Sequence, residues 1–289
     1  MTDSQPLGFI GTGVMGAPMC RNLARKSGRR VLAWDLSPER LRDVDAEAAD
    51  SPGALAAQAQ VLFVCLPGGA QLQALCETAL LAAARPGLTL VDLGTSGVSL
   101  TRDLAARFAA RGAHYADAPV ARTRAAAEAG TLSITVGAAE EVFARLLPLL
   151  RCLGTDITHC GAVGSGQVVK ILNNMVLFQT VNALAEALAL GRRAGVDPAL
   201  LFDALSKGSA DSFALRNHGM KAMLPGTYPE RAFSVQYAAK DNGYALELGR
   251  ETGVRLRGAA LLADLLEEAR QAGLGADYWP AIAKLVDRP

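Results

Sequence analysis

The sequence predicts an α/β fold in which a doubly wound, mainly parallel sheet is followed by an all-α C-terminal domain. Three observations lead to this prediction. Over roughly the first 160 residues, short apolar runs alternate with helical stretches rich in alanine and leucine. The apolar runs are continuous, which is typical of parallel strands covered on both faces. After the glycine-rich stretch 161–166, strand signals nearly vanish and helical periodicity continues to the end.

The expected elements follow from these patterns in chain order. Strands are expected at 7–11, 30–35, 61–66, 88–93, 113–119 and 132–137, and helices between them at 15–27, 70–84 and 98–111. Further helices, separated by Gly and Pro, are expected at 167–194, 198–206, 211–222, 234–252 and 255–272. We therefore predict two domains, 1–163 and 164–289, with a long interdomain helix at about 167–194.

Composition narrows the classes of partner. The chain has 289 residues, 51% of them hydrophobic, so it can bury a large core. Its net charge is +1, and the basic residues are spread along the chain, which disfavours nucleic acid as a partner. The longest apolar segment contains Gln179, Asn182 and Glu186, so we interpret it as a buried soluble helix and expect no membrane association.

The cysteines and histidines give no sign of a metal site. Five cysteines without a Cys-x-x-Cys pair suggest neither zinc nor a disulfide framework, and the three histidines show no ligand spacing. A reducing compartment fits this usage, and the N-terminal stretch has no basic region followed by a long apolar one. We expect a cytoplasmic protein without a bound metal.

The first strand is followed by Gly11-x-Gly13-x-x-Gly16 and then by a helix. Gly11 permits a tight turn, Gly13 lets the backbone approach a pyrophosphate, and Gly16 lets the helix pack closely on the sheet. The free N–H groups at the helix N-terminus favour phosphate binding. The alternative is an ordinary glycine turn, but the strand and helix context favours a Rossmann-like dinucleotide site.

Asp35 closes the next strand, 19 residues after Gly16. A carboxylate there accepts hydrogen bonds from the ribose of NAD and repels the 2′-phosphate of NADP, so we predict NAD as the cofactor; the alternative is a simple turn acid. The strand ends "CLPGG" (65–69) and "DLGTS" (92–96) should line the same crevice. The cofactor-binding residues predicted from these turns are Gly11, Thr12, Gly13, Val14, Met15, Gly16, Asp35, Leu66 and Pro67.

In "GSGQVVKILNN" (164–174), Lys170, Asn173 and Asn174 share one face of an otherwise apolar helix, because residues three and four apart are neighbours. Two interpretations stay open on the residues alone. Lys170 could extend its charge past the helix edge to water while the asparagines bond locally. Alternatively, Lys170 could be a general acid/base, since a nearby cationic nicotinamide and apolar neighbours lower the pKa of a lysine.

Four stretches together resemble the β-hydroxyacid dehydrogenase family, which includes 3-hydroxyisobutyrate dehydrogenase, tartronate semialdehyde reductase and sulfolactaldehyde reductase. They are "GFIGTGVMGAPMCRNL", "DAPV" followed by "GTL", "GSGQVVKILNN" and "FSVQYAAKDNGYALEL", in the family's order and spacing. The resemblance covers nearly the whole chain. It implies a Rossmann-like domain, a long interdomain helix, an all-α C-terminal domain and assembly into homodimers or homotetramers.

The resemblance also implies roles for individual residues. Lys170 matches the family's catalytic lysine, and Asn174, beside Asn173, matches the asparagine that orients the substrate hydroxyl. Thr95 and Phe233 are expected near the nicotinamide. Lys240 matches a lysine of the cofactor and substrate cleft.

One loop departs from the family pattern. Many members have Ser-Gly-Gly where this chain has Ala121, Arg122 and Thr123, and Gly94 replaces a common serine. We predict that Arg122, with Thr123 beside it, binds the substrate's anionic group, because a guanidinium matches an oxyanion in a bidentate way. Arg124 is interpreted as a surface residue.

The prediction is thus an NAD-dependent oxidoreductase of a small 3-hydroxy acid, similar to 3-hydroxyisobutyrate dehydrogenase, with Lys170 as general acid/base. The "VxRT" loop and "DYW" (277–279) are similar to sulfolactaldehyde reductase, although Leu177 replaces a small hydroxyl residue of that pattern, so a sulfonate is the alternative to a carboxylate. Other classes are a non-catalytic NAD-binding module and an imine reductase, and the presence of Lys170 disfavours both. The sequence does not name the acid.

Overall fold

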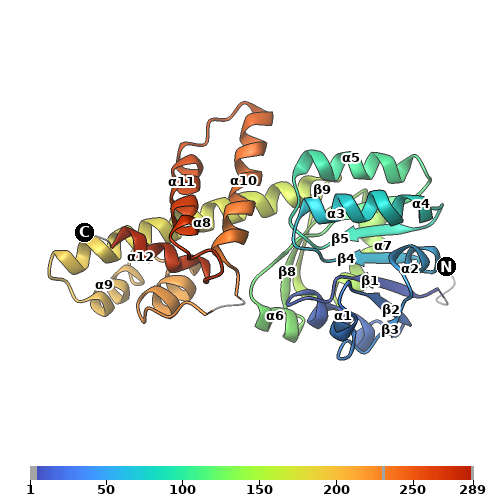
Figure 1. Cartoon of the computed structure of the whole chain (residues 1–289), viewed down its shortest axis with the longest axis horizontal. Helices are drawn as coiled ribbons and strands as arrows, with labels where there is room; N and C mark the ends of the chain where they lie inside the picture. The colour runs from blue at the N-terminus through green and yellow to red at the C-terminus, as the bar shows by residue number, and fades with distance from the viewer. Residues whose placement is uncertain (1–4, 230–231, 288–289) are drawn as a thin grey trace. The chain divides into compact units, whose positions relative to one another are not determined.

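The computed structural model describes residues 5–229 and 232–287 (Figure 1). The chain forms two compact units, Met1–Lys170 and Ile171–Pro289. The division falls inside one long helix, α8 (Ser165–Arg193). The predicted boundary between residues 163 and 164 lies just before that helix begins, and it stays a prediction.

The first unit contains a nine-stranded, mostly parallel sheet with strand order β3-β2-β1-β4-β5-β6-β8-β7, in which β9 also pairs with β8. Among the described strands of this sheet, the pairs that β8 makes with β6 and β7 are antiparallel and the others are parallel. The predicted mainly parallel sheet is confirmed. Its strands are β1 (Leu7–Ile10), β2 (Val31–Trp34), β3 (Glu47–Ala48), β4 (Val61–Val64), β5 (Thr89–Asp92), β6 (His114–Asp117), β7 (Val120–Ala121), β8 (Leu132–Gly137) and β9 (Gly154–Gly161).

Alternate residues of the central strands enter two separate cores, since successive side chains of a strand point to opposite faces. Phe9 and Phe63 pack in one core with helices α1 (Gly16–Lys26), α6 (Arg124–Ala129) and α7 (Glu140–Leu150), and their rings stack at 6.3 Å. Ile10 and Leu62 pack in the other core with α2 (Pro52–Gln58), α3 (Gly69–Leu75) and α5 (Val98–Ala109). Figure 1 shows α3 and α5 on one side of the sheet and α1 and α6 on the other. Burial on both faces explains the continuous apolar runs.

The helical segments of the first unit connect these strands. They are α1 (Gly16–Lys26), η1 (Pro38–Leu41), α2 (Pro52–Gln58), α3 (Gly69–Leu75), η2 (Cys76–Leu80), α4 (Leu81–Ala83), α5 (Val98–Ala109), α6 (Arg124–Ala129) and α7 (Glu140–Leu150). The predicted helix 70–84 is divided into three pieces by the π-helical turn η2.

Two segments differ from the predictions. Strand β9 was not expected, because its sequence "GTDITHCG" is polar and its side chains are mostly half-buried or exposed. The segment 120–131, between two expected strands and interpreted as a loop, holds β7 and the helix α6. The Thr123 side chain accepts a hydrogen bond from the Ala126 N–H, and Gly130 ends the helix at φ +69°, so the local capping residues supply both ends. The alanines 125–127 favour helix between them.

The second unit is helical in its described residues. Its core brings together the C-terminal part of α8 with the segments that follow, around the buried Phe178, Phe202 and Trp279. Helix α8 is long and apolar enough to cross a membrane, a property that core helices of soluble proteins share. The later segments are α9 (Pro198–Leu205), η3 (Leu215–Met223), α10 (Val235–Thr252), α11 (Arg257–Gln271), η4 (Trp279–Ile282) and α12 (Ala283–Val286).

Candidate active site

The turn between β1 and α1 has the geometry that the glycines predict. Gly11 adopts φ +90°, and a Cβ there would lie 2.2 Å from the Cys65 carbonyl oxygen. A Cβ on Gly16 would lie 1.8 Å from the Gly11 carbonyl oxygen, so neither position accepts a side chain. At Gly13 the nearest atom to such a Cβ is an Arg40 nitrogen at 3.9 Å, which leaves this side of the turn open.

The start of α1 is suited to an anion. Met15 at the N-cap makes no side-chain hydrogen bond to the helix, and the first turn contains no acidic residue. The unpaired N–H groups of a first helical turn, with the positive end of the helix dipole, bind phosphate. Together with the open face of Gly13, this fits a dinucleotide pyrophosphate. Val14, half-exposed beside it, borders the same turn.

Asp35 ties the end of β2 to this turn. Its Oδ2 accepts hydrogen bonds from the Thr12 backbone N–H at 2.7 Å and from the Thr12 hydroxyl at 3.3 Å. Its Oδ1 accepts from the Ser37 N–H at 2.9 Å and lies 3.7 Å from the guanidinium of Arg40. Asp35 is thus a buried part of the glycine turn, as well as the residue that the sequence places nearest a ribose.

Two further predicted cofactor segments lie at the same edge of the sheet. Leu66 and Pro67 follow β4, Thr95 follows β5, and β2, β1, β4 and β5 are neighbouring parallel strands. A Cβ on Gly94 would come within 3.1 Å of the Leu66 carbonyl oxygen, so these two turns approach closely. The structure therefore brings the predicted cofactor residues of the first unit to one edge, where open α/β sheets bind ligands.

The beginning of α8 lies at the carboxyl ends of β5 and β6. The Asp117 carboxylate accepts hydrogen bonds from the N–H groups of Gly164 and Gln167, both at 2.7 Å. Burial raises the pKa of Asp117 to about 6, although backbone hydrogen bonds oppose the shift. Lys170 follows on the next turn of the helix and is half-buried.

In the second unit, two predicted residues meet at one buried carboxylate that the sequence analysis did not single out. The Asn174 amide donates to Asp241 Oδ2 at 2.8 Å, and the Lys240 ammonium lies 2.8 Å from Asp241 Oδ1. Asn173 in turn donates to Asn174 Oδ1 at 3.1 Å. Asp241 is 2% exposed, so it fixes both partners from within the core. In the sequence, the feature that could have indicated Asp241 is its position directly after Lys240.

Aromatic rings lie near Lys240, and two of them belong to α10. The ammonium of Lys240 lies 5.1 Å from the centre of the Tyr244 ring and 5.8 Å from that of Tyr237. Phe233, expected near the nicotinamide, stacks at 6.0 Å on both Phe178 and Tyr237 and stays partly exposed. The rings limit the directions open to the Lys240 side chain.

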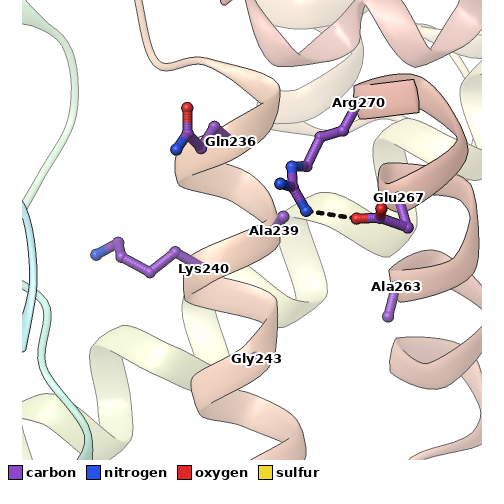
Figure 2. Close-up of a pocket in the computed structure, with 7 residues that line it drawn as sticks. All are labelled: Gln236, Ala239, Lys240, Gly243, Ala263, Glu267 and Arg270. Atoms are coloured by element: carbon purple, nitrogen blue, oxygen red, sulfur yellow. Dashed lines mark hydrogen bonds and ion pairs between the residues drawn. The ribbon is translucent and has the colours of Figure 1, made fainter. Parts of the chain in front are cut away.

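A cavity of about 410 Å³ lies between α10 and α11, and Figure 2 shows the residues that line it. Of the predicted site residues, Lys240 lines it. On the α11 side, Arg270 and Glu267 form an ion pair at 2.5 Å. The lining also includes three small residues, Ala239, Gly243 and Ala263.

Arg122 lies at the end of β7 with an unusual backbone, φ +86°. Its guanidinium donates to the Thr131 carbonyl oxygen at 2.6 Å and pairs with Asp156 of β9 at 2.8 Å. An anionic substrate would therefore share this guanidinium with Asp156, whose pKa is lowered by hydrogen bonds from Thr155 and Arg122. Thr123 caps α6. The substrate-binding roles of Arg122 and Thr123 stay predictions.

Among residues 5–229 and 232–287, no group of three or more His, Cys, Asp or Glu side chains is arranged to hold a metal ion.

Two family profiles match the chain. Residues 6–161 match the NAD binding domain of 6-phosphogluconate dehydrogenase. Residues 164–286 match the NAD-binding domain of NADP-dependent 3-hydroxyisobutyrate dehydrogenase. The fold and the glycine turn thus define an NAD(P)-binding oxidoreductase, and the two descriptions name both forms of the cofactor.

Relatives extend over nearly the full chain. A 2-(hydroxymethyl)glutarate dehydrogenase of Eubacterium barkeri is 36% identical over 99% of this chain and 96% of its own length. A 3-hydroxyisobutyrate dehydrogenase of Pseudomonas aeruginosa is 38% identical over 85% of both chains. The solved structure of Mycobacterium tuberculosis 3-hydroxyisobutyrate dehydrogenase with L-serine superposes with a TM-score of 0.89 at 29% identity, covering 99% of this chain and all of that one. The chain belongs to the β-hydroxyacid dehydrogenase family and is an oxidoreductase acting on a CH–OH group.

Proposed function

We propose that the protein interconverts a small 3-hydroxy acid and its aldehyde or ketone, with NAD(H) as cofactor and Lys170 as general acid/base. The observation that carries the proposal is the position of Lys170 on the second turn of α8, whose first turn is hydrogen-bonded to the strand edge that holds the cofactor turns. Family membership makes a CH–OH substrate the natural partner for that lysine.

When bound, the nicotinamide takes or gives the hydride. The residues of this chain accept or donate the proton. In oxidation, neutral Lys170 accepts the proton of the substrate hydroxyl at Nζ; in reduction, the Lys170 ammonium donates it to the developing alkoxide. Asn174, held by Asp241, is suited to orient the hydroxyl. The glycine turn and the α1 N-terminus would hold the pyrophosphate.

The preference for NAD rests on Asp35, buried beside the glycine turn with its charge 3.7 Å from Arg40. The carboxylate opposes a 2′-phosphate, whereas the neighbouring guanidinium would favour one. We propose that the carboxylate dominates, because it is fixed by two backbone N–H groups while the Arg40 side chain is 55% exposed. A lower KM for NADP than for NAD would contradict this.

A hydroxysulfonate, as in sulfolactaldehyde reductase, is the second candidate substrate. Arg122 supports it, since a guanidinium binds sulfonate and carboxylate alike. A non-catalytic NAD-binding module is the candidate of another class, and both Lys170 and Asn174 weigh against it. Assembly into homodimers or homotetramers and a cytoplasmic location stay predictions.

The test is a rate screen with purified protein. NAD reduction is followed with 3-hydroxyisobutyrate, 3-hydroxypropionate, serine and glycerate, and NADH oxidation with tartronate semialdehyde and sulfolactaldehyde. Turnover of one carboxylate well above the others supports the proposal. Turnover of sulfolactaldehyde alone replaces it with the second candidate, and NADH binding without turnover of any of the compounds favours the non-catalytic module.

A further inference from the structure

A buried polar network joins the start of α8 to two strand ends of the first unit. Its side chains, Asp92, Ser96, Asp117 and Gln167, are each at most 1% exposed. Burying two carboxylates and an amide is costly unless each is hydrogen-bonded. The network therefore has to be satisfied by fixed partners, which makes its geometry specific.

Asp117 caps α8 with both carboxylate oxygens. Oδ1 accepts from the Gly164 N–H and Oδ2 from the Gln167 N–H, each at 2.7 Å. Two glycines leave room for this contact. A Cβ on Gly137 would lie 2.4 Å from Asp117 Oδ1, and a Cβ on Gly166 would lie 2.8 Å from Oδ2. A carboxylate from β6 thus replaces the side-chain cap that the helix sequence itself would otherwise supply.

Gln167 makes the second connection, to the turn after β5. Its Nε2 donates to the Gly94 carbonyl oxygen at 2.9 Å, and its Oε1 accepts from the Ser96 N–H at 3.1 Å. These two contacts lie on either side of Thr95. Asp92 supports the same turn, because it accepts from the Gly94 N–H at 2.9 Å and from the Ser96 hydroxyl at 3.0 Å.

We propose that Asp117 and Gln167 are positioning residues, which fix the rotation and height of α8 against the strand edge and so place Lys170 relative to the turn that carries Thr95. Lys170 lies three residues after Gln167, slightly less than one helical turn. Any rotation at Gln167 therefore moves the lysine around the helix axis. The proposal rests on the proposed role of Lys170 and names the residues that place its ammonium near the cofactor side of the sheet.

The chemistry explains why Asp117 is a carboxylate. An asparagine has one acceptor oxygen, and its NH₂ group would face a backbone N–H donor. Asp117→Asn therefore keeps the shape of the side chain and loses one of the two contacts to α8. Because misplacement by about 1 Å can reduce a rate about 100-fold, we expect kcat to fall between about 10- and 100-fold. We expect the Kd for NADH to change less than about 3-fold, because Asp117 contacts no part of the glycine turn in the bonds described above.

The test is a double-mutant cycle between Asp117→Asn and Lys170→Ala, measured as kcat with the best substrate and as NADH Kd by fluorescence. If Asp117 acts through the lysine, Asp117→Asn lowers kcat in the wild-type background and leaves the residual kcat of Lys170→Ala unchanged within about 3-fold. Equal losses in both backgrounds would show a merely structural role and overturn the proposal. A kcat of Asp117→Asn within about 2-fold of wild type would also overturn it.

Two controls keep the outcome clear. Ser51→Ala removes the N-cap bond of α2, at Ala54 N, in the same unit and is expected to leave kcat unchanged despite lower stability. Should Asp117→Asn not fold, Gln167→Met takes its place in the cycle, with the same expected and overturning results. If Lys170→Ala itself retains wild-type kcat, the proposed function fails, which differs from failure of the positioning role alone.

Discussion

The two units hold their buried carboxylates in different ways. In the first unit, the carboxylates of Asp35, Asp92 and Asp117 each accept at least one hydrogen bond from a backbone N–H. In the second unit, the described bonds of Asp241 and His218 come from side chains, Asn174 and Tyr278. Backbone donors persist when side chains change, whereas side-chain partners can be lost by one substitution. The candidate site of the first unit should therefore depend on backbone geometry, and that of the second unit on individual side chains.

The largest effect is expected for a backbone change in the first unit. In Gly16→Ala the new methyl group would lie 1.8 Å from the Gly11 carbonyl oxygen, so the turn must shift. We expect the free energy of unfolding to fall by about 2–4 kcal/mol and NADH binding to be lost. Urea unfolding and NADH fluorescence measure this. Gly53→Ala, where a Cβ meets nothing within 4 Å, is the control and should retain both. Normal NADH affinity in Gly16→Ala would contradict the backbone account.

In the second unit, the largest effect of a single side chain is expected at Asp241. Asp241→Asn removes the charge that pairs with Lys240 in a site only 2% exposed. We expect the free energy of unfolding to fall by about 1–3 kcal/mol and kcat/KM to fall about 10-fold, with NADH binding less affected. Asp203→Asn, which breaks the exposed pair with Lys207, should change stability by less than about 0.5 kcal/mol. Similar small effects of both variants would contradict the dependence of the second unit on individual buried side chains.

Arg122 is the exception in the first unit, because its predicted role depends on its own side chain and on the ion pair with Asp156. Arg122→Gly relieves the backbone strain at φ +86°, a conformation that costs a non-glycine residue about 1–2 kcal/mol. The substitution also removes the exposed ion pair with Asp156. The free energy of unfolding should therefore change by less than about 1 kcal/mol, while KM for the acid rises about 10-fold. Steady-state kinetics tests this against Arg124→Ala, whose pair with Glu128 lies on α6. An unchanged KM in Arg122→Gly would exclude anion binding there.

The smallest effect concerns pH in the second unit. Burial lowers the pKa of His218 from 6.5 to about 4, so the unfolded chain binds the proton more tightly than the folded one. Its contribution to stability is complete above pH 6.5 and is lost as the pH falls toward 4. Between pH 8 and pH 6, the free energy of unfolding of the wild type should fall by about 1 kcal/mol more than that of His218→Gln. Urea unfolding at both pH values measures the difference, and equal losses would show that His218 does not set this dependence.

The sequence was sufficient for the parts that repeat a regular pattern. The continuous apolar runs located the central strands to within one or two residues, and the glycine spacing located the tight turn between β1 and α1. It failed where tertiary contacts replace local signals. Strand β9 is polar and pairs along one edge with β8, so no hydrophobic periodicity marks it. Helix α6 was not predicted, because its capping residues, Thr123 and Gly130, were interpreted as parts of a loop.

At the candidate site, the sequence indicated candidate side chains but not the residues to which they are hydrogen-bonded. The spacing of Lys170 and Asn174 was visible in the sequence, whereas Asp241 lies 67 residues from Asn174 and is brought to it by the packing of α10. Asp117 and Gln167 are likewise 50 residues apart. The Arg122 pair with Asp156 could not be foreseen without β9. Contacts of this kind depend on the fold and leave no local pattern.

The measurement that tests the central claim most directly is the kcat of Lys170→Ala, with NADH affinity measured on the same preparation. The account predicts an NADH Kd within about 3-fold of wild type and a kcat lowered by about 100- to 10,000-fold, because the proton transfer is lost while the backbone cofactor turn is intact. A kcat near that of wild type, in protein that binds NADH normally, would contradict the role of Lys170 and with it the proposed mechanism.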